Sequence, residues 1–205
     1  MTKTVLFDMD GVLIDATEWH YEALNESLEI FGFSIPRDEH LSRFNGMTTR
    51  SKLEILSGEK NLPRGLHDII SDIKQDRTLR IAARMCFPNA SHLILLSSLK
   101  ERNIKVGVVT NSIRLTSEFM LEYAGLTKYL DVLITNEDVA SPKPAPDGYL
   151  LAMERLQSLP EETVVVEDGD HGVAAAVSAG ARVIRVRNPG DVSLELIEGI
   201  VGKTK

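Results

Sequence analysis

The chain contains 205 residues, of which 43% are hydrophobic, so it can bury a sizeable core and is not a disordered segment. Its formal net charge of -7 argues against a general nucleic-acid binder, and no apolar stretch approaches the length needed to span a membrane. Because Cys86 is the only cysteine, no intrachain disulfide can form, and because residues 1–4 lead directly into the first predicted strand, we expect no signal peptide and a cytoplasmic protein.

The first predicted strand is followed by two carboxylates. Residues 5–7 form an apolar run without polar alternation, which is typical of a buried strand in a parallel sheet. Asp8 and Asp10 come directly after it, and Gly11 follows them. Open α/β sheets bind their ligands outside the carboxyl ends of the strands, so this pair lies where a site is expected. The alternative is a solvated turn, since aspartate and glycine are common in turns.

Residues 15–86 contain no convincing strand and are predicted to form a helical insertion. We expect one helix with Leu24, Leu28 and Phe31 on one face and Gly32 at its end, and further helices over residues 48–56 and 66–84. A helical module placed directly after Asp8 and Asp10 could close over a site at the sheet edge.

The rest of the chain alternates strands and helices. Four more runs rich in β-branched residues are predicted as strands, over residues 106–109, 132–134, 164–166 and 183–186. One helix is expected before them, beginning at Asn89 and running to Arg102, and further helices are expected between them, including one with Tyr149, Met153 and Leu156 on one face. This alternation predicts an α/β fold with a Rossmann-like, doubly wound parallel sheet, formed by residues 1–14 and 87–205.

Polar groups follow the predicted strands. They are Thr110, Asn111 and Ser112 after the second strand, Lys143 between two prolines, and Glu167 and Asp168 after the fourth strand. In a parallel sheet these groups would join Asp8 and Asp10 at one edge. The acids could hold Mg2+, the hydroxyl and backbone N–H groups could hold phosphate, and the lysine could neutralise it. Phosphoryl transfer needs this inventory, because its catalysis is mostly positioning and charge stabilisation.

Four motifs make the resemblance to a known family specific. They occupy residues 7–12, 109–112, 143–147 and 167–172, and read Phe-Asp-Met-Asp-Gly-Val, Val-Thr-Asn-Ser, Lys-Pro-Ala-Pro-Asp and Glu-Asp-Gly-Asp-His-Gly. With this order and a helical insertion after the first motif, the chain resembles the haloacid dehalogenase (HAD) superfamily. It is most similar to the β-phosphoglucomutase-like and phosphoglycolate phosphatase-like members with a helical cap, and the resemblance covers nearly the whole chain.

The resemblance implies a nucleophile and an acid–base group in the first motif. Asp8 would attack the substrate phosphorus and form an aspartyl-phosphate, while Asp10 would protonate the leaving oxygen and then activate water. Mg2+ would be held by the Asp8 carboxylate, the backbone carbonyl of Asp10, Asp168 and waters, a set of hard oxygen ligands that suits this ion. Glu167 would be a further ligand, directly or through water, or would orient Lys143.

Thr110 and Lys143 complete the predicted catalytic set. Thr110 would bind the phosphoryl group, although on its own it could be an ordinary strand end or helix cap. Lys143 is expected to pair with the negative charge of the site rather than to be solvated. Asn111 and Ser112 are predicted to bind substrate, because they would open the next helix and helix N-termini favour anions.

Substrate selection is assigned to the helical insertion. His20 resembles a histidine that lies near the substrate in the β-phosphoglucomutase-like group, although its spacing also fits a core histidine. Gly46 would permit close backbone approach, and Arg50 could bind a second phosphate or a sugar hydroxyl. Lys74 and Arg77 are further candidates to face the site.

Two positions depart from the family pattern. Ala16 stands where mutase-like members often carry a hydroxyl residue. Gly169 replaces the usual serine after the Glu–Asp pair, and His171 follows it. Neither change removes a catalytic carboxylate, but both could alter loop conformation or selectivity.

We therefore expect a Mg2+-dependent phosphatase of a small phosphorylated metabolite, such as a sugar or polyol phosphate, with no nucleic-acid or membrane partner. The alternative is a sugar phosphate mutase that uses the same aspartates and must protect its aspartyl-phosphate from water. A dehalogenase would not need Asp10, and a noncatalytic binding protein would not need the full set of carboxylates and Lys143. Whether the protein is a monomer or a homodimer stays open.

Overall fold

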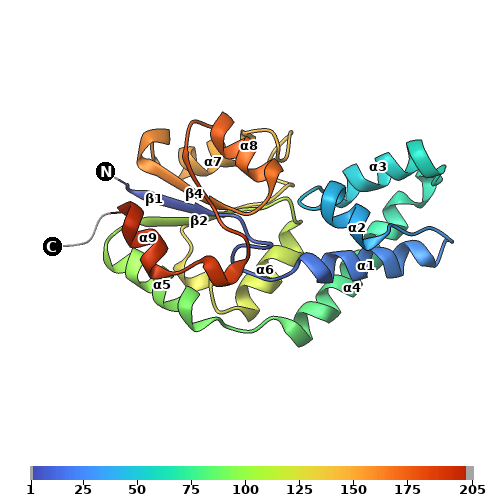
Figure 1. Ribbon diagram of the computed structural model, residues 1–205, viewed down its shortest axis with the longest axis horizontal. Helices are drawn as coiled ribbons and strands as arrows, with labels where there is room; N and C mark the ends of the chain where they lie inside the picture. Colours follow the sequence, from blue (N-terminus) through green and yellow to red (C-terminus); the bar gives the residue numbers. More distant parts are fainter. Residues whose placement is uncertain (1, 202–205) are drawn as a thin grey trace.

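A computed structural model describes residues 2–201, and its centre is a five-stranded parallel sheet (Figure 1). The strands are β1 Thr4–Phe7, β2 Lys105–Val109, β3 Val132–Ile134, β4 Thr163–Glu167 and β5 Arg182–Arg185. Each lies within about one residue of its predicted bounds, so the α/β prediction is confirmed. Glu167 is the last residue of β4 rather than the first residue after it.

The strand order places β1 in the middle of the sheet. The order is β3-β2-β1-β4-β5, and Phe7 lies opposite Val108 on one side and Val166 on the other. The chain therefore builds outward from β1 in both directions, which makes the end of β1 a topological switch point. Ligands of open α/β sheets bind at such a point, and Asp8 is the next residue of the chain.

Helices cover both faces of the sheet (Figure 1). Val5 and Phe7 pack toward α5, α6 and α9, whereas Leu6 packs toward α7 and α8, as expected from the alternation of side chains along a strand. The bounds are α5 Ala90–Glu101, α6 Arg114–Tyr123, α7 Asp147–Arg155, α8 Asp170–Ser178 and α9 Leu194–Val201. Short 3-10 turns cover Thr127–Tyr129, Pro160–Glu162 and Pro189–Asp191.

The helical insertion lies beyond the carboxyl ends of the strands (Figure 1). It contains α1 Thr17–Glu29, α2 Arg37–Glu39, a π-helical turn His40–Phe44, α3 Thr49–Lys60, a 3-10 turn Arg64–Leu66 and α4 His67–Met85. Leu24 and Leu28 of α1 pack with Leu53 and Leu56 of α3 in a hydrophobic cluster separate from those of the sheet. The domain division at 14/15 and 86/87 is kept as a prediction.

Local signals account for some of the helix ends. The Thr48 side chain accepts a hydrogen bond from the Ser51 N–H at the start of α3, and the Asn89 side chain does the same for Ser91 at the start of α5. The first predicted helix ends at Glu29, a turn earlier than expected, and Gly32 closes the following turn with a φ of +79°. The helices α2 and α9 and the π-helical turn were not predicted from the sequence. Among the described residues, no helix is both long and apolar enough to cross a membrane.

Candidate active site

The two aspartates of the first motif leave β1 in a tight turn. Asp8 is buried, and its backbone N–H donates to the carbonyl of Val166 at 2.9 Å, which extends the pairing of β1 with β4 by one residue. Gly11 adopts a φ of +89°, and a Cβ there would lie 2.2 Å from Oδ2 of Asp168. Only glycine suits this position, because the turn needs a left-handed backbone and brings the chain against a carboxylate.

Lys143 is held in a buried cage of acceptors. Its Nζ donates to Asp8 Oδ1 at 2.6 Å, to Glu167 Oε1 at 2.6 Å and to the carbonyl of Val109 at 2.7 Å. An ammonium group has three N–H donors, so these three contacts use all of them. Lys143 therefore has the charge partners that the sequence analysis predicted, and its orientation is fixed before any ligand binds.

Both carboxylate oxygens of Glu167 accept hydrogen bonds from other groups of the protein. Its Oε1 accepts from Lys143 and from the hydroxyl of Tyr149, at 2.6 and 2.9 Å, and its Oε2 accepts from the backbone N–H groups of Asp168 and Gly169, at 3.0 and 3.2 Å. These contacts favour the second of the two expected roles, in which Glu167 orients Lys143. Tyr149 was predicted only as a core residue, and no sequence signal indicated that its hydroxyl reaches this carboxylate.

The carboxylates around Lys143 carry more negative charge than this one ammonium group neutralises. Burial raises the pKa of Asp8 well above its usual range, Lys143 opposes this, and the carboxylates of Glu167, Asp10 and Asp168 add to it. Burial and Glu167 likewise raise the pKa of Asp168 to about 6. For Lys143 burial disfavours the charge, but Asp8 and Glu167 together raise its pKa well above the usual range. One ammonium does not balance the two buried acids, Asp8 and Glu167, and the half-buried Asp168, and a bound cation would.

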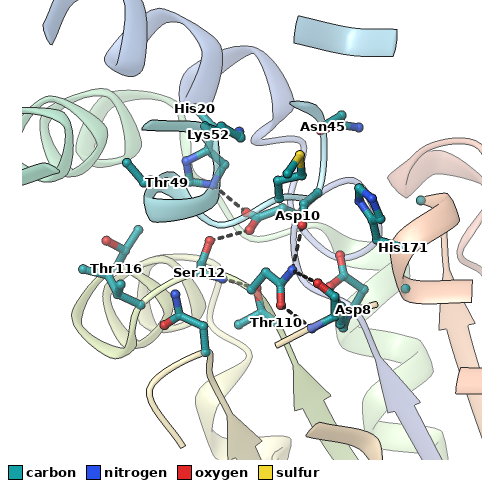
Figure 2. Close-up of a pocket in the computed structure, with 18 of the residues that line it drawn as sticks. Asp8, Asp10, His20, Asn45, Thr49, Lys52, Thr110, Ser112, Thr116 and His171 are labelled. Carbon is teal, nitrogen blue, oxygen red and sulfur yellow. Dashed lines mark hydrogen bonds and ion pairs between the residues drawn. The ribbon is translucent and has the colours of Figure 1, made fainter. Parts of the chain in front are cut away.

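This cluster fits the predicted Mg2+ site. Carboxylate oxygens of Asp8, Glu167 and Asp168 lie within 4.8 Å of one another, and oxygen is the ligand type that Mg2+ prefers. The side chain of Asp10 is not part of this group and points elsewhere (Figure 2). Only its backbone carbonyl is therefore a candidate ligand, as the resemblance implied.

Asp10 has a different environment from Asp8. Its Oδ2 accepts from the Ser112 hydroxyl at 2.7 Å, and its Oδ1 lies 3.0 Å from Nε2 of His20, close enough for an ion pair but without the alignment of a hydrogen bond (Figure 2). Burial alone would raise the pKa of Asp10, but His20, Ser112 and Lys74 together lower it. The chain thus holds two carboxylates, two residues apart, in opposite electrostatic settings.

His20 links Asp10 to the helical insertion. Its Nδ1 lies 3.1 Å from Nζ of Lys74, and burial together with this ammonium lowers the pKa of His20. An ammonium group can only donate, so Nδ1 accepts from Lys74 and the ring proton lies on Nε2, facing Asp10. The structure therefore places His20 in the site rather than in the hydrophobic core.

The groups that follow β2 mostly bind other parts of the protein. Thr110 Oγ1 accepts from the Ser112 N–H at 3.0 Å, which leaves the threonine hydroxyl proton free to donate into the cavity. The Asn111 amide donates to the carbonyls of Gly46 and Lys143 at 2.8 and 3.0 Å, and its Oδ1 accepts from the Lys143 N–H at 3.0 Å. Asn111 therefore ties the insertion to the lysine loop, and Gly46 enters this contact with a φ of +74°.

The N-terminus of α6 does not provide the anion site that was expected there. The helix begins at Arg114 rather than at Asn111, and the Arg114 N–H donates to a carboxylate oxygen of Glu137 at 2.5 Å. An acidic side chain of the protein thus already occupies the positive end of this helix. This corrects the expectation that the segment directly after Thr110 opens the helix, whereas substrate binding by Asn111 and Ser112 stays a prediction.

A cavity of about 220 Å³ connects these groups with the helical insertion. The predicted residues that line it are Asp8, Asp10, His20, Gly46, Arg50, Lys74, Thr110, Asn111, Ser112, Lys143, Glu167, Asp168 and His171. Arg77, which was only a candidate to face the site, lies outside the cavity and pairs with Glu26 at 3.1 Å. Arg50 lines the cavity but is exposed. The volume fits a small metabolite rather than a polymer.

Lys52 lines the same cavity and was missed by the sequence analysis. It is only 6% exposed, and its Nζ lies 3.3 Å from Nε2 of His40. A signal was present, because Lys52 stands directly before Leu53, which is buried in the insertion cluster. A lysine at the border of a buried helix face calls for a reason, since lysine is almost never buried without a partner.

Comparison with known proteins supports the family resemblance. A family model described as haloacid dehalogenase-like hydrolase matches residues 5–186. A phosphorylated carbohydrates phosphatase from Thermotoga maritima is 32% identical over 197 residues, which is 94% of this chain and 90% of that protein. These matches confirm the prediction made from the four motifs.

Solved structures share the fold over most of the chain. CbbY from Rhodobacter sphaeroides, crystallised with xylulose-1,5-bisphosphate, is 26% identical, with a TM-score of 0.81 and coverage of 90% of this chain and 86% of that one. A β-phosphoglucomutase from Clostridium difficile is 20% identical, with a TM-score of 0.83 and coverage of 97% and 96%. The second likeness concerns the fold alone.

Proposed function

Because this chain belongs to the haloacid dehalogenase-like hydrolases, we propose that it is a Mg2+-dependent phosphatase of a small phosphorylated metabolite, with sugar and polyol phosphates as the substrate class. The observation that carries the proposal is the contrast between Asp8 and Asp10. One carboxylate lies against Lys143 in the acidic cluster, and the other is held separately by Ser112 and His20. Two carboxylates in opposite environments are typical of a site that divides nucleophilic and acid–base roles.

In the first step, an Asp8 oxygen forms a bond to the substrate phosphorus while the ester P–O bond breaks. The leaving oxygen takes a proton from Asp10, so the alcohol departs neutral. The Lys143 ammonium and the Thr110 hydroxyl stabilise the charge of the phosphoryl oxygens from positions that the fold has already fixed. When bound, Mg2+ would neutralise phosphoryl charge from the side of Asp8, Asp168 and the Asp10 carbonyl.

In the second step, a water oxygen bonds to phosphorus and the bond between Asp8 and phosphorus breaks. Asp10 accepts the proton from this water and returns to its starting state. The hydrogen bond from Ser112 and the nearby His20 favour the anionic form of Asp10, which suits the role of base in this step. The acid role in the first step requires that Asp10 takes up a proton when the substrate binds. The sum of the two steps is hydrolysis of a phosphoric monoester to an alcohol and inorganic phosphate.

The relatives support this substrate class. The Thermotoga maritima relative is named a phosphorylated carbohydrates phosphatase, and a CbbY structure holds a sugar bisphosphate. The cavity of about 220 Å³ accommodates a molecule of this size. We therefore infer a carbohydrate-derived phosphate rather than a nucleic acid or a phosphoprotein.

The proposal is tested by release of phosphate from p-nitrophenyl phosphate, with and without Mg2+. Asp8→Asn should lower kcat by at least about a thousandfold, as expected when a covalent nucleophile is lost. Asp15→Asn is the matched control, because Asp15 is an exposed aspartate close to the same turn, and its activity should equal that of the unchanged protein. Equal activity in Asp8→Asn would exclude Asp8 as the nucleophile. Conversion of glucose 1-phosphate to glucose 6-phosphate without phosphate release would instead identify a mutase.

A further inference from the structure

Two lysines of the helical insertion line the cavity opposite the acidic cluster. Lys52 and Lys74 come from α3 and α4, and both face the same space as Asp10. Figure 2 shows Lys52 beside His20, on the opposite side of Asp10 from Asp8 and Thr110. Lys74 is placed by its contact with Nδ1 of His20 at 3.1 Å, on the ring edge away from Asp10. Both ammonium groups therefore lie beyond the reacting centre, where the remainder of a bound substrate would extend.

Neither ammonium group makes an ion pair with a carboxylate in the part of the chain that the structure describes. Lys52 contacts Nε2 of His40 at 3.3 Å and Lys74 contacts Nδ1 of His20 at 3.1 Å, so each has one imidazole partner for three N–H donors. The pKa of His40 is lowered to about 3 by burial and by Lys52, so this ring stays neutral and brings no charge. Lys52 is buried and Lys74 is half-buried, and charges removed from water in this way are normally paired.

The two ammonium groups also destabilise each other. Burial, with the repulsion from Lys74, lowers the pKa of Lys52 to about 7, and burial lowers the pKa of Lys74 to about 8. Asp10 is the acid that opposes both shifts, and Ser112 and His20 already hold its carboxylate. An additional anion between the two lysines would satisfy the free donors and remove the repulsion.

We propose that Lys52 and Lys74 bind a second anionic group of the substrate, a carboxylate or a second phosphate, while its first phosphate reacts at Asp8. This inference rests on the proposed phosphatase function, because it concerns the other end of the same molecule. Arg50 was expected to bind a second phosphate of the substrate, and the inference assigns this contact to Lys52 instead. Arg50 is exposed and solvated, so it discriminates weakly, whereas a buried ammonium group left without a partner penalises a neutral substrate.

Pairs of substrates that share a skeleton and differ in the second anion test the inference. Glycerol 3-phosphate is compared with 3-phosphoglycerate, and glucose 6-phosphate with glucose 1,6-bisphosphate, by kcat/KM for phosphate release with Mg2+. The unchanged protein should prefer the member with two anionic groups in at least one pair by tenfold or more, the effect of about one charge-assisted hydrogen bond. The first pair reports a carboxylate and the second pair a phosphate.

Substitution of Lys52 separates this role from a structural one. Lys52→Met should reduce the preference at least about tenfold, mainly through KM, and Lys52→Arg should restore part of it. Lys60→Met is the matched control, because Lys60 lies on the same helix, pairs with Glu39 at 3.3 Å and does not line the cavity, so the preference should not change. If Lys52→Met does not fold, Lys52→Gln takes its place.

The outcomes separate the two proposals. Magnesium-dependent release from p-nitrophenyl phosphate that is lost in Asp8→Asn, with no preference in either pair, would overturn the anion subsite and leave the phosphatase in place. A preference that persists in both Lys52→Met and Lys52→Gln would also overturn it. Activity that does not depend on Asp8 would overturn both proposals together.

Discussion

Lys143 and Lys52 are lysines of one cavity with similar burial and opposite electrostatics. Their exposed fractions are 8% and 6%, yet the pKa of Lys143 is raised and that of Lys52 is lowered to about 7. The difference lies in their partners, because Lys143 contacts two carboxylates at 2.6 Å and Lys52 contacts a neutral imidazole at 3.3 Å. Burial alone disfavours both charges, and only the partners decide the outcome.

This contrast assigns different tasks to the two halves of the site. On the sheet side, the donors of Lys143 are satisfied before substrate arrives, which keeps Asp8 and Glu167 in fixed positions. On the insertion side, charge is left without a counterpart. Lys143 already has its charge partners, which suits the chemistry common to many substrates. The ammonium groups of the insertion have no carboxylate partner, which suits selection of one class of substrate.

Among the changes that test this comparison, the largest effect is expected from removing Lys143 and its ion pairs with Asp8 and Glu167. Lys143→Met leaves Asp8 and Glu167 buried without their cation, and it should lower kcat by at least about a hundredfold and the free energy of unfolding by about 3–5 kcal/mol. Lys3→Met is the control, because Lys3 pairs with Glu162 at the same 2.6 Å but is 65% exposed in its side chain. That change should cost under about 1 kcal/mol in a denaturant titration. Equal losses in the two variants would show that burial does not control the strength of these pairs.

Substitution of Lys52, on the insertion side, is expected to change the free energy of unfolding in the opposite direction. Lys52→Met removes a buried, unpaired ammonium group, so it should stabilise the free protein at pH 6 by roughly 2–4 kcal/mol, since each unit of pKa shift corresponds to about 1.4 kcal/mol. The pKa of Lys52 is about 7 when folded and higher when unfolded, so between these values the unfolded chain binds more protons and stability rises with pH. The gain from the substitution should therefore shrink toward pH 10.

Thermal unfolding at several pH values measures this gain. The titratable groups that face Lys52 are His20, His40, Lys74 and Asp10, and they are unchanged in the variant. A Lys52→Met protein that is less stable than the unchanged protein at pH 6 would contradict the account of this side.

The smallest effect is expected from Tyr149→Phe. This change removes one hydrogen bond to Glu167 and keeps the packing of the ring, so it should cost about 1–2 kcal/mol of unfolding free energy and reduce kcat only a few-fold. Lys143 still fixes Glu167 from the other side. A loss of activity as large as that of Lys143→Met would mean that Tyr149, rather than the lysine, holds the cluster together.

The same contrast explains what the sequence could predict. Asp8, Asp10, Lys143 and Asp168 directly follow strands or lie in short motifs, so local patterns were enough to find them and a parallel sheet was enough to bring them together. The fold class and the bounds of the strands followed from apolar runs for the same reason. The order of the strands and the helix α9 did not, because both depend on long-range packing rather than on local signals.

Lys52 and the hydroxyl of Tyr149 show the limit most clearly. Each lies on a helix whose apolar pattern predicts only a core face, and each role depends on a partner from a different part of the chain. Asn111 is a similar case, since it was predicted to bind substrate, and the sequence did not indicate that its amide also joins Gly46 to the Lys143 loop. Local sequence identified the side chains that we propose carry the chemistry and could not show how the other side chains are paired.

The central claim, that Asp8 carries the phosphoryl group, is tested most directly by trapping the intermediate. The protein is mixed with a hydrolysed substrate and Mg2+, quenched in acid within the first turnover, and digested for mass spectrometry. The account predicts one phosphoryl group on the peptide that contains Asp8, no such adduct in Asp8→Asn, and slower loss of the adduct in Asp10→Asn. A phosphoryl group on any other residue, or rapid turnover in Asp8→Asn, would contradict it.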